Sequence, residues 1–170
     1  MKKKITIIFM IIICFIISGC EAEQKVKLDT NLSDSINIDD DGAKLVCTMD
    51  IDYTEYNYTL GSKYVVFADK DNKVTKVKSS EMINSSDEEK LDEFESYLNT
   101  NHDLAMQYNG YTYDVKREKD KVISDVTIDY SEFDLKKFTE DNKTSNTEEL
   151  TIDSIEKQYV SLGATCTRKD

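Results

Sequence analysis

The chain has 170 residues, with no proline, no tryptophan and one histidine, and its 34 acidic residues outnumber 22 basic ones to give a net charge of −12. A surface this acidic repels the phosphates of nucleic acids and anionic lipid head groups, so we expect no nucleic-acid partner. The same charge could attract cations or basic peptides, or could simply keep the protein soluble beside an anionic envelope.

The first 20 residues carry the pattern of an export signal. Lysines at positions 2–4 precede an apolar run from Ile5 to Ile17, which is shorter than the roughly 20 residues of a membrane-spanning helix. The run ends in Ile17-Ser18-Gly19-Cys20, which resembles the lipobox of bacterial lipoproteins. The resemblance implies cleavage after Gly19 and lipidation of Cys20. The alternative is an uncleaved single-span anchor with an incidental cysteine.

Processing at this site would leave residues 20–170 on the extracytoplasmic face of the cell membrane, held there by the lipid on Cys20. The removed segment holds three lysines and no acidic residue, so the net charge falls from −12 to −15. Residues 21–42 are polar and poor in aromatics, which predicts a flexible tether; Ile36 and Ile38 could form a short strand or dock on the domain. The expected organisation is a signal peptide (1–19), lipidated Cys20 with its tether (20–42) and one domain (43–170).

A partial calcium-loop pattern lies within the tether. Asn37, Asp39, Asp41 and Gly42 match the alternating oxygen ligands and the glycine of such a loop. The twelfth position is Thr48 instead of a bidentate glutamate, and the flanking residues do not predict helices. We therefore expect a solvated acidic turn here, and neither a metal nor a cofactor.

Two cysteines, Cys47 and Cys166, remain after Cys14 in the signal and lipidated Cys20 are set aside. Outside the membrane such a pair predicts a disulfide, here between the first and last strands of the domain. Redox pairs usually lie close together as Cys-x-x-Cys, and a metal site would need further His or Cys ligands besides the single His102. A disulfide closing this long loop would add roughly 4–5 kcal/mol of stability at best.

Alternating apolar and polar residues predict six strands. They lie at residues 43–53, 56–66, 73–78, 111–115, 122–130 and 164–167. Short connections between the first three favour an antiparallel meander. Gly61-Ser62, near the middle of the second strand, suggests a bulge or bend.

Helical periodicity predicts one long and one short helix. The long helix should begin after the hydroxyl caps Ser85 and Ser86, span residues 87–107 and end at Asn109-Gly110, with a weak stretch at 99–103. The short helix should lie near 152–162, and Phe133, Leu135 and Phe138 suggest an amphipathic turn over the core. The fold class is therefore α+β: an antiparallel sheet of five or six strands with one long and one short helix packed on it.

The order of these segments resembles the YehR-like family of small bacterial lipoproteins of unknown function. The resemblance covers roughly residues 43–168, and its most distinctive parts are Val126-Thr127-Ile128-Asp129-Tyr130 and the closing helix with Gly163 and Cys166. It implies an α+β domain, an envelope location and no assigned activity. No functional residues come with the family.

The single histidine and the tyrosines are the residues that could form a functional site. His102, beside Asp103, could act as a base, but no motif places a serine or cysteine nucleophile next to it, and we expect it to be exposed on the helix surface. The ten tyrosines fit half-buried strands, and could alternatively line a surface for a peptide or sugar.

No catalytic constellation is evident, and we do not expect an enzyme. The favoured hypothesis is a membrane-anchored extracytoplasmic lipoprotein that binds an envelope protein, a peptide or a small molecule. The alternative is an envelope-acting hydrolase with paired surface carboxylates, drawn from Asp50, Asp52, Asp125 and Asp129.

Overall fold

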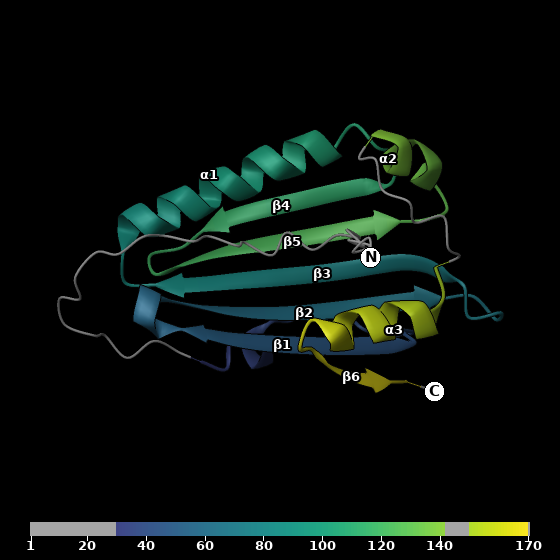
Figure 1. The fold of residues 1–170 in the computed structure, drawn as a ribbon, viewed down its shortest axis with the longest axis horizontal. Helices are drawn as coiled ribbons and strands as arrows, with labels where there is room; N and C mark the ends of the chain where they lie inside the picture. Colours follow the sequence, from purple (N-terminus) through teal and green to yellow (C-terminus); the bar gives the residue numbers. More distant parts are fainter. Residues whose placement is uncertain (1–29, 142–149, 170) are drawn as a thin grey trace, which may run out of the picture.

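The computed structural model describes residues 30–141 and 150–169, which form an α+β domain on a six-stranded antiparallel sheet (Figure 1). The predicted fold class is confirmed. The strand order is β4-β5-β3-β2-β1-β6. In chain order the elements are η1 (Leu32–Ser35), β1 (Leu45–Tyr53), η2 (Thr54–Tyr56), β2 (Tyr58–Ala68), β3 (Val74–Ser85), α1 (Glu88–Ala105), β4 (Tyr111–Arg117), β5 (Lys121–Asp129), α2 (Leu135–Asp141), α3 (Ile152–Ser161) and β6 (Thr165–Arg168).

The first three strands form the predicted meander, but β3 is longer than expected. It continues past Lys78 through Ser79-Ser80-Glu81 to Ser85, and it pairs with β2 and β5 over this length. The polar stretch looks like a loop in the sequence because it interrupts the apolar alternation. It lies at the centre of the sheet, where strands on both sides satisfy its backbone.

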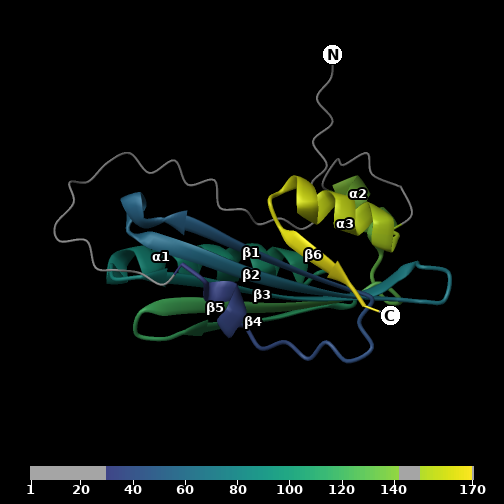
Figure 2. The same ribbon diagram turned by 90° about the horizontal axis from the view of Figure 1, so that it is seen from below.

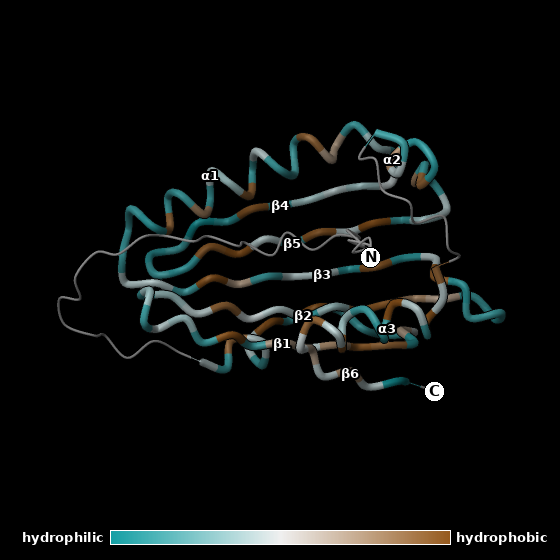
Figure 3. The backbone as a smooth tube through the Cα atoms, in the orientation of Figure 1, coloured by the Kyte–Doolittle hydropathy of each residue, from teal (hydrophilic) through white to brown (hydrophobic). Residues whose placement is uncertain are grey.

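The two faces of the sheet are covered differently. Cross-strand partners lie on the same face, so Leu60, Ile83 and Val122 share the face on which α1 packs. The core around α3 includes Tyr64 and its cross-strand partner Cys47. Tyr64 is four residues after Leu60 on β2, so both residues point to the same face and both helices pack on it. Figure 2 shows α3 above the sheet and the purple segment around η1 below it. Figure 3 shows the mixture of hydrophobic and hydrophilic residues along each strand.

Helix α1 buries Leu91, Phe94 and Leu98, as its periodicity predicts. The N-cap is Asp87, whose carboxylate accepts the Lys90 N–H, and not Ser85 or Ser86 as expected. The predicted weak stretch 99–103 lies within the continuous helix.

The C-terminal part contains two further helices. The predicted amphipathic turn is helix α2, and Phe133 and Phe138 pack with Tyr108 beside it. Helix α3 begins with a capping box in which Thr151 and Ser154 exchange side-chain to backbone hydrogen bonds.

The disulfide prediction is confirmed. Cys47 on β1 and Cys166 on β6 are cross-strand partners, and their sulfur atoms are 2.05 Å apart. The bridge spans 119 residues of sequence and holds the short edge strand β6 against the sheet.

Part of the expected tether is folded onto the domain. Leu32 and Ile36 are buried against Met82, and the Ser33 N–H donates to Asp50 at 2.9 Å. Ile38 packs against the same cluster, so docking is the outcome for this segment. The flexible tether predicted for 20–42 is therefore wrong for residues 32–38, because three apolar side chains within seven residues suffice to anchor them.

Gly61 explains how this segment packs so closely. The predicted bulge is not at Gly61, since β2 and β3 stay in register there and shift only between Phe67 and Ala68. A Cβ at position 61 would lie 2.4 Å from the Leu32 Cβ and 2.6 Å from the Ser33 nitrogen. The glycine thus gives the docked segment room against the sheet.

Candidate functional site

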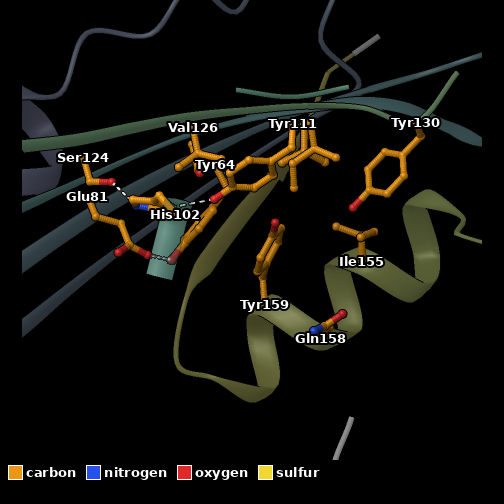
Figure 4. A pocket seen from close by; sticks show the side chains of 13 residues that line it. Tyr64, Glu81, His102, Tyr111, Ser124, Val126, Tyr130, Ile155, Gln158 and Tyr159 are labelled. Carbon is orange, nitrogen blue, oxygen red and sulfur yellow. Dashed lines mark hydrogen bonds between the residues drawn. The ribbon is translucent and has the colours of Figure 1, made fainter. Parts of the chain in front are cut away.

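A pocket lies between α1 and α3 on the face that both helices cover. A six-stranded sheet is about 24 Å wide, whereas a helix with its side chains covers about 10–12 Å. Helix α1 contacts β3, β4 and β5, and α3 contacts β1 and β6, so the middle of the face lies between them. The pocket's floor and walls come from β2, β3, β4, β5, α1 and α3, and its lining residues are Tyr64, Val77, Ser79, Glu81, His102, Tyr111, Ser124, Val126, Ile128, Tyr130, Ile155, Gln158 and Tyr159 (Figure 4).

Glu81 is the carboxyl group in this lining. It lies on β3, directly opposite Ser62 of β2 and Ser124 of β5. The Tyr64 hydroxyl donates to its Oε1 at 3.3 Å, a long hydrogen bond (Figure 4). Burial raises the pKa of Glu81 to about 7, and the bond from Tyr64 opposes this rise. The side chain is therefore near half ionisation at neutral pH.

Two tyrosines close the α3 side of the pocket. The rings of Tyr64 and Tyr159 stack with centroids 4.4 Å apart. Burial raises the pKa of both hydroxyls above the ordinary range, so they stay protonated and can donate. In Figure 4 Tyr159 extends from α3 towards the sheet. Tyr64 and Tyr159 therefore form one wall of the pocket.

His102 is buried, at 3% exposure, and the prediction of an exposed surface histidine is wrong. Its Nδ1 lies 2.6 Å from the Tyr111 hydroxyl and its Nε2 lies 2.8 Å from the Ser124 Oγ. Burial lowers its pKa, and the carboxylate of Asp103 opposes this, so the ring is neutral at pH 7. Tyr113 stacks on the ring with centroids 4.7 Å apart.

The contact between His102 and Ser124 raises the question of nucleophilic catalysis, since a serine does lie beside the histidine. Ser124 is in the interior strand β5, which pairs with β3 on one side and β4 on the other. Its neighbouring backbone N–H groups are used by these ladders, so this part of the described chain offers no free donors for an oxyanion. The third group is a tyrosine hydroxyl, which would not stabilise an imidazolium as a carboxylate does.

The four aspartates proposed for the alternative hydrolase lie on the opposite face. Asp50 and Asp52 are on β1, Asp125 and Asp129 are on β5, and β2 and β3 separate the two strands. Three strand spacings make about 14 Å, which exceeds the roughly 5–10 Å of paired catalytic carboxylates.

Each of these aspartates has a local partner. Asp50 accepts from Ser33, and Asp52 accepts the Thr54 N–H at 2.9 Å. Asp125 lies 3.6 Å from the ammonium of Lys116, and Asp129 lies 3.2 Å from that of Lys76. The structure thus does not bring the β1 and β5 carboxylates together.

The partial calcium loop forms an exposed turn before β1. The Asp39 carboxylate accepts the Asp41 N–H, and Gly42 has a positive φ of 74°. Across residues 30–141 and 150–169, no group of three or more His, Cys, Asp or Glu side chains is arranged to hold a metal ion.

The lipidation site Cys20 and the signal peptide lie outside the described residues. Among the helices that the structure describes, none combines the length and the apolar character needed to span a bilayer.

The sequence contains a signal for one of the buried polar residues of the pocket but not for the other. His102 is four residues after Leu98 and three before Ala105, so it falls on the apolar stripe of α1. A polar residue on such a stripe faces the interior and needs partners there. Glu81 had no comparable signal, because the strand that carries it was expected to end at Lys78.

Comparisons with known proteins add little about this site. No family model and no curated protein matches the chain. Among solved structures, the chain is similar to an NMR structure of a protein from Streptococcus pneumoniae TIGR4, with 14% sequence identity and a TM-score of 0.42. That likeness covers 88% of this chain and 100% of the other.

Proposed function

We propose that the protein is a lipid-anchored extracytoplasmic binding module whose ligand site is the pocket between α1 and α3. The observation that carries the proposal is Glu81, a half-buried carboxyl that lines this pocket with one long hydrogen bond from Tyr64 among the described residues. The lipobox at Cys20 and the resemblance to YehR-like lipoproteins support the location.

An ordinary core would place an aliphatic residue where Glu81 stands. The raised pKa means that ionising Glu81 in the folded protein is unfavourable, so the residue lowers stability at neutral pH. Ser62, directly opposite, is fully buried, and among the described residues its Oγ forms no hydrogen bond of standard geometry, the Tyr64 hydroxyl being the polar group near it. Polar groups that cost stability without structural partners are typical of binding sites.

The size of the pocket limits what enters it. Its cavity volume is about 40 Å³, and a water needs roughly 10–15 Å³ on this measure, so about three waters would fill it. Drug-sized ligands occupy several hundred Å³. The pocket therefore takes a small ligand or one end of a longer one.

Native mass spectrometry of the mature protein in detergent tests this function. The protein is incubated with envelope extract, washed and measured beside the variants Glu81→Gln and Glu93→Gln, the second removing an exposed carboxylate from α1. We expect an adduct of defined mass on the wild type and on Glu93→Gln, and a weaker one on Glu81→Gln. A bare mass in all three samples, or equal adducts on all three, would contradict a ligand site at Glu81.

A further inference from the structure

The charge of the pocket points to the chemistry of its ligand. Glu81 is the one carboxyl among the lining residues, and that lining contains neither lysine nor arginine. A carboxylate in such a site repels anions and attracts cations, and the interaction is stronger than in bulk water because the protein around the half-buried carboxylate lowers the local dielectric. The mature chain's net negative charge acts in the same direction.

Among residues 30–141 and 150–169, the pocket lining supplies no counter-ion for Glu81. His102 is the basic side chain in the lining, but both of its ring nitrogens contact Tyr111 and Ser124. A carboxylate offers about four lone-pair sites, and Tyr64 uses one. Glu81 therefore retains acceptor capacity for a donor that enters from outside.

The tyrosines distinguish between kinds of cation. A quaternary ammonium binds to open aromatic faces, as in a cage. Tyr64 and Tyr159 instead stack on each other at 4.4 Å, so each covers one face of the other. A primary ammonium needs hydrogen-bond acceptors, which the carboxylate and the nearby hydroxyl oxygens supply.

We propose that the pocket binds the primary ammonium group of a small organic cation, with Glu81 as its counter-ion. The inference rests on the proposed binding function and names the ligand class for that site. The apolar lining residues Val126, Ile128 and Ile155 would contact the carbon chain that carries the ammonium group.

The probe is n-butylammonium chloride, added to the mature protein in detergent and compared with sodium chloride at equal ionic strength. Binding is followed through the backbone amide resonances of the pocket residues Ser79 and Tyr159, which the wild type and both variants share, and the titration of Glu81 through the ¹³C resonance of its side-chain carboxyl in the wild type. We expect saturable binding in the order of millimolar, at least tenfold weaker in Glu81→Gln and unchanged in the exposed-site control Glu93→Gln. Equal affinity of Glu81→Gln would overturn the assignment, as would tetramethylammonium binding as tightly as butylammonium.

A second readout follows from the charge pairing. The titratable groups that share the pocket with Glu81 are Tyr64 from β2, Tyr111 from β4, Tyr130 after β5, His102 from α1 and Tyr159 from α3. All of them are neutral at pH 7, so a bound ammonium would be the cation nearest to Glu81 and should lower the midpoint of its titration by about one pH unit. An unchanged midpoint at saturation would contradict the pairing.

The two proposals can fail separately. An extract ligand that binds the wild type, binds Glu81→Gln more weakly and is not displaced by butylammonium would overturn the ammonium assignment while keeping the binding function. An absence of any extract adduct together with no butylammonium response would overturn both.

Discussion

The Tyr64 hydroxyl lies 3.3 Å from the Glu81 carboxylate, on adjacent strands at the centre of the sheet. This is the hydrogen bond that the described residues provide to Glu81, and the pocket between α1 and α3 opens beside it. The centre of the sheet is where a fold of this size ordinarily places aliphatic side chains. The polar pair therefore separates the cores beneath the two helices and makes room for a site.

The stability of the protein should depend on pH through Glu81. Its pKa is about 7 in the folded state and near 4.5 when unperturbed, so the unfolded chain releases the proton first and stability falls as pH rises from about 4.5 to 7. Glu81→Gln keeps the acceptor for Tyr64 but cannot ionise. It should match the wild type below pH 4.5 and exceed it above pH 7.5 by roughly 3 kcal/mol.

Urea unfolding at pH 4 and pH 8 measures this difference, with Glu93→Gln as the control for loss of a surface charge. A constant offset between Glu81→Gln and the wild type at both pH values would show that Glu81 does not titrate in this window.

Replacing His102 should destabilise the domain strongly. His102→Ala leaves the Tyr111 hydroxyl and the Ser124 Oγ buried without their shared partner and opens a cavity under α1. We expect a loss of about 2–4 kcal/mol in the free energy of unfolding. Leu104→Ala, at an exposed position of the same helix, should stay within about 0.5 kcal/mol. Equal small effects of both changes would indicate an exposed histidine.

A side chain at position 61 should detach the segment around η1. In Gly61→Ala the new Cβ would collide with Leu32 and with the Ser33 backbone. The sheet can remain intact, because β2 keeps its register with β1 and β3. We expect faster amide hydrogen exchange at Ser33, whose N–H donates to Asp50, with little change in the amides of β2. Unaltered protection at Ser33 would refute this packing argument.

Membrane attachment is predicted to depend on Cys20. Cys20→Ala removes the acceptor sulfur of the expected lipobox, so the protein should leave the acylated membrane fraction or accumulate as precursor. Fractionation with metabolic fatty-acid labelling measures this, and Cys14→Ala serves as the control that keeps the acceptor. Normal, acylated Cys20→Ala would refute the lipobox.

The sequence predicted the strands, the long helix and the disulfide of this fold better than its candidate site, and particular residues show why. Half-buried strands such as β1 alternate regularly, α1 has a clear apolar stripe, and Cys47 and Cys166 can form one intramolecular pair. Glu81 was missed because Ser79-Ser80-Glu81 breaks the alternation of β3. His102 was misplaced because a histidine beside an aspartate is typical of an exposed helix surface, although its position falls on the apolar stripe of α1. A strand or helix is recognised in a sequence by its regularly spaced apolar residues. A polar residue at a buried position interrupts that spacing, so it obscures the very element that carries the site.

The docking of Leu32 and Ile36 on the sheet could not be predicted from the local sequence pattern either. Two isolated apolar residues in a polar segment give no periodic signal. Their burial depends on Gly61 and Met82, which lie on distant strands and form the receiving surface only after the sheet has assembled.

The most direct test of the account is to locate bound ligand on the protein. Two-dimensional ¹H–¹⁵N NMR spectra of the mature protein in detergent should be recorded before and after adding the low-molecular-mass fraction of envelope extract. The account predicts resonance changes at pocket residues such as Ser79, Glu81 and Tyr159, and their loss in Glu81→Gln. Changes confined to the opposite face, around Ser33 and Asp50, or equal changes in Glu81→Gln, would contradict a binding site between α1 and α3.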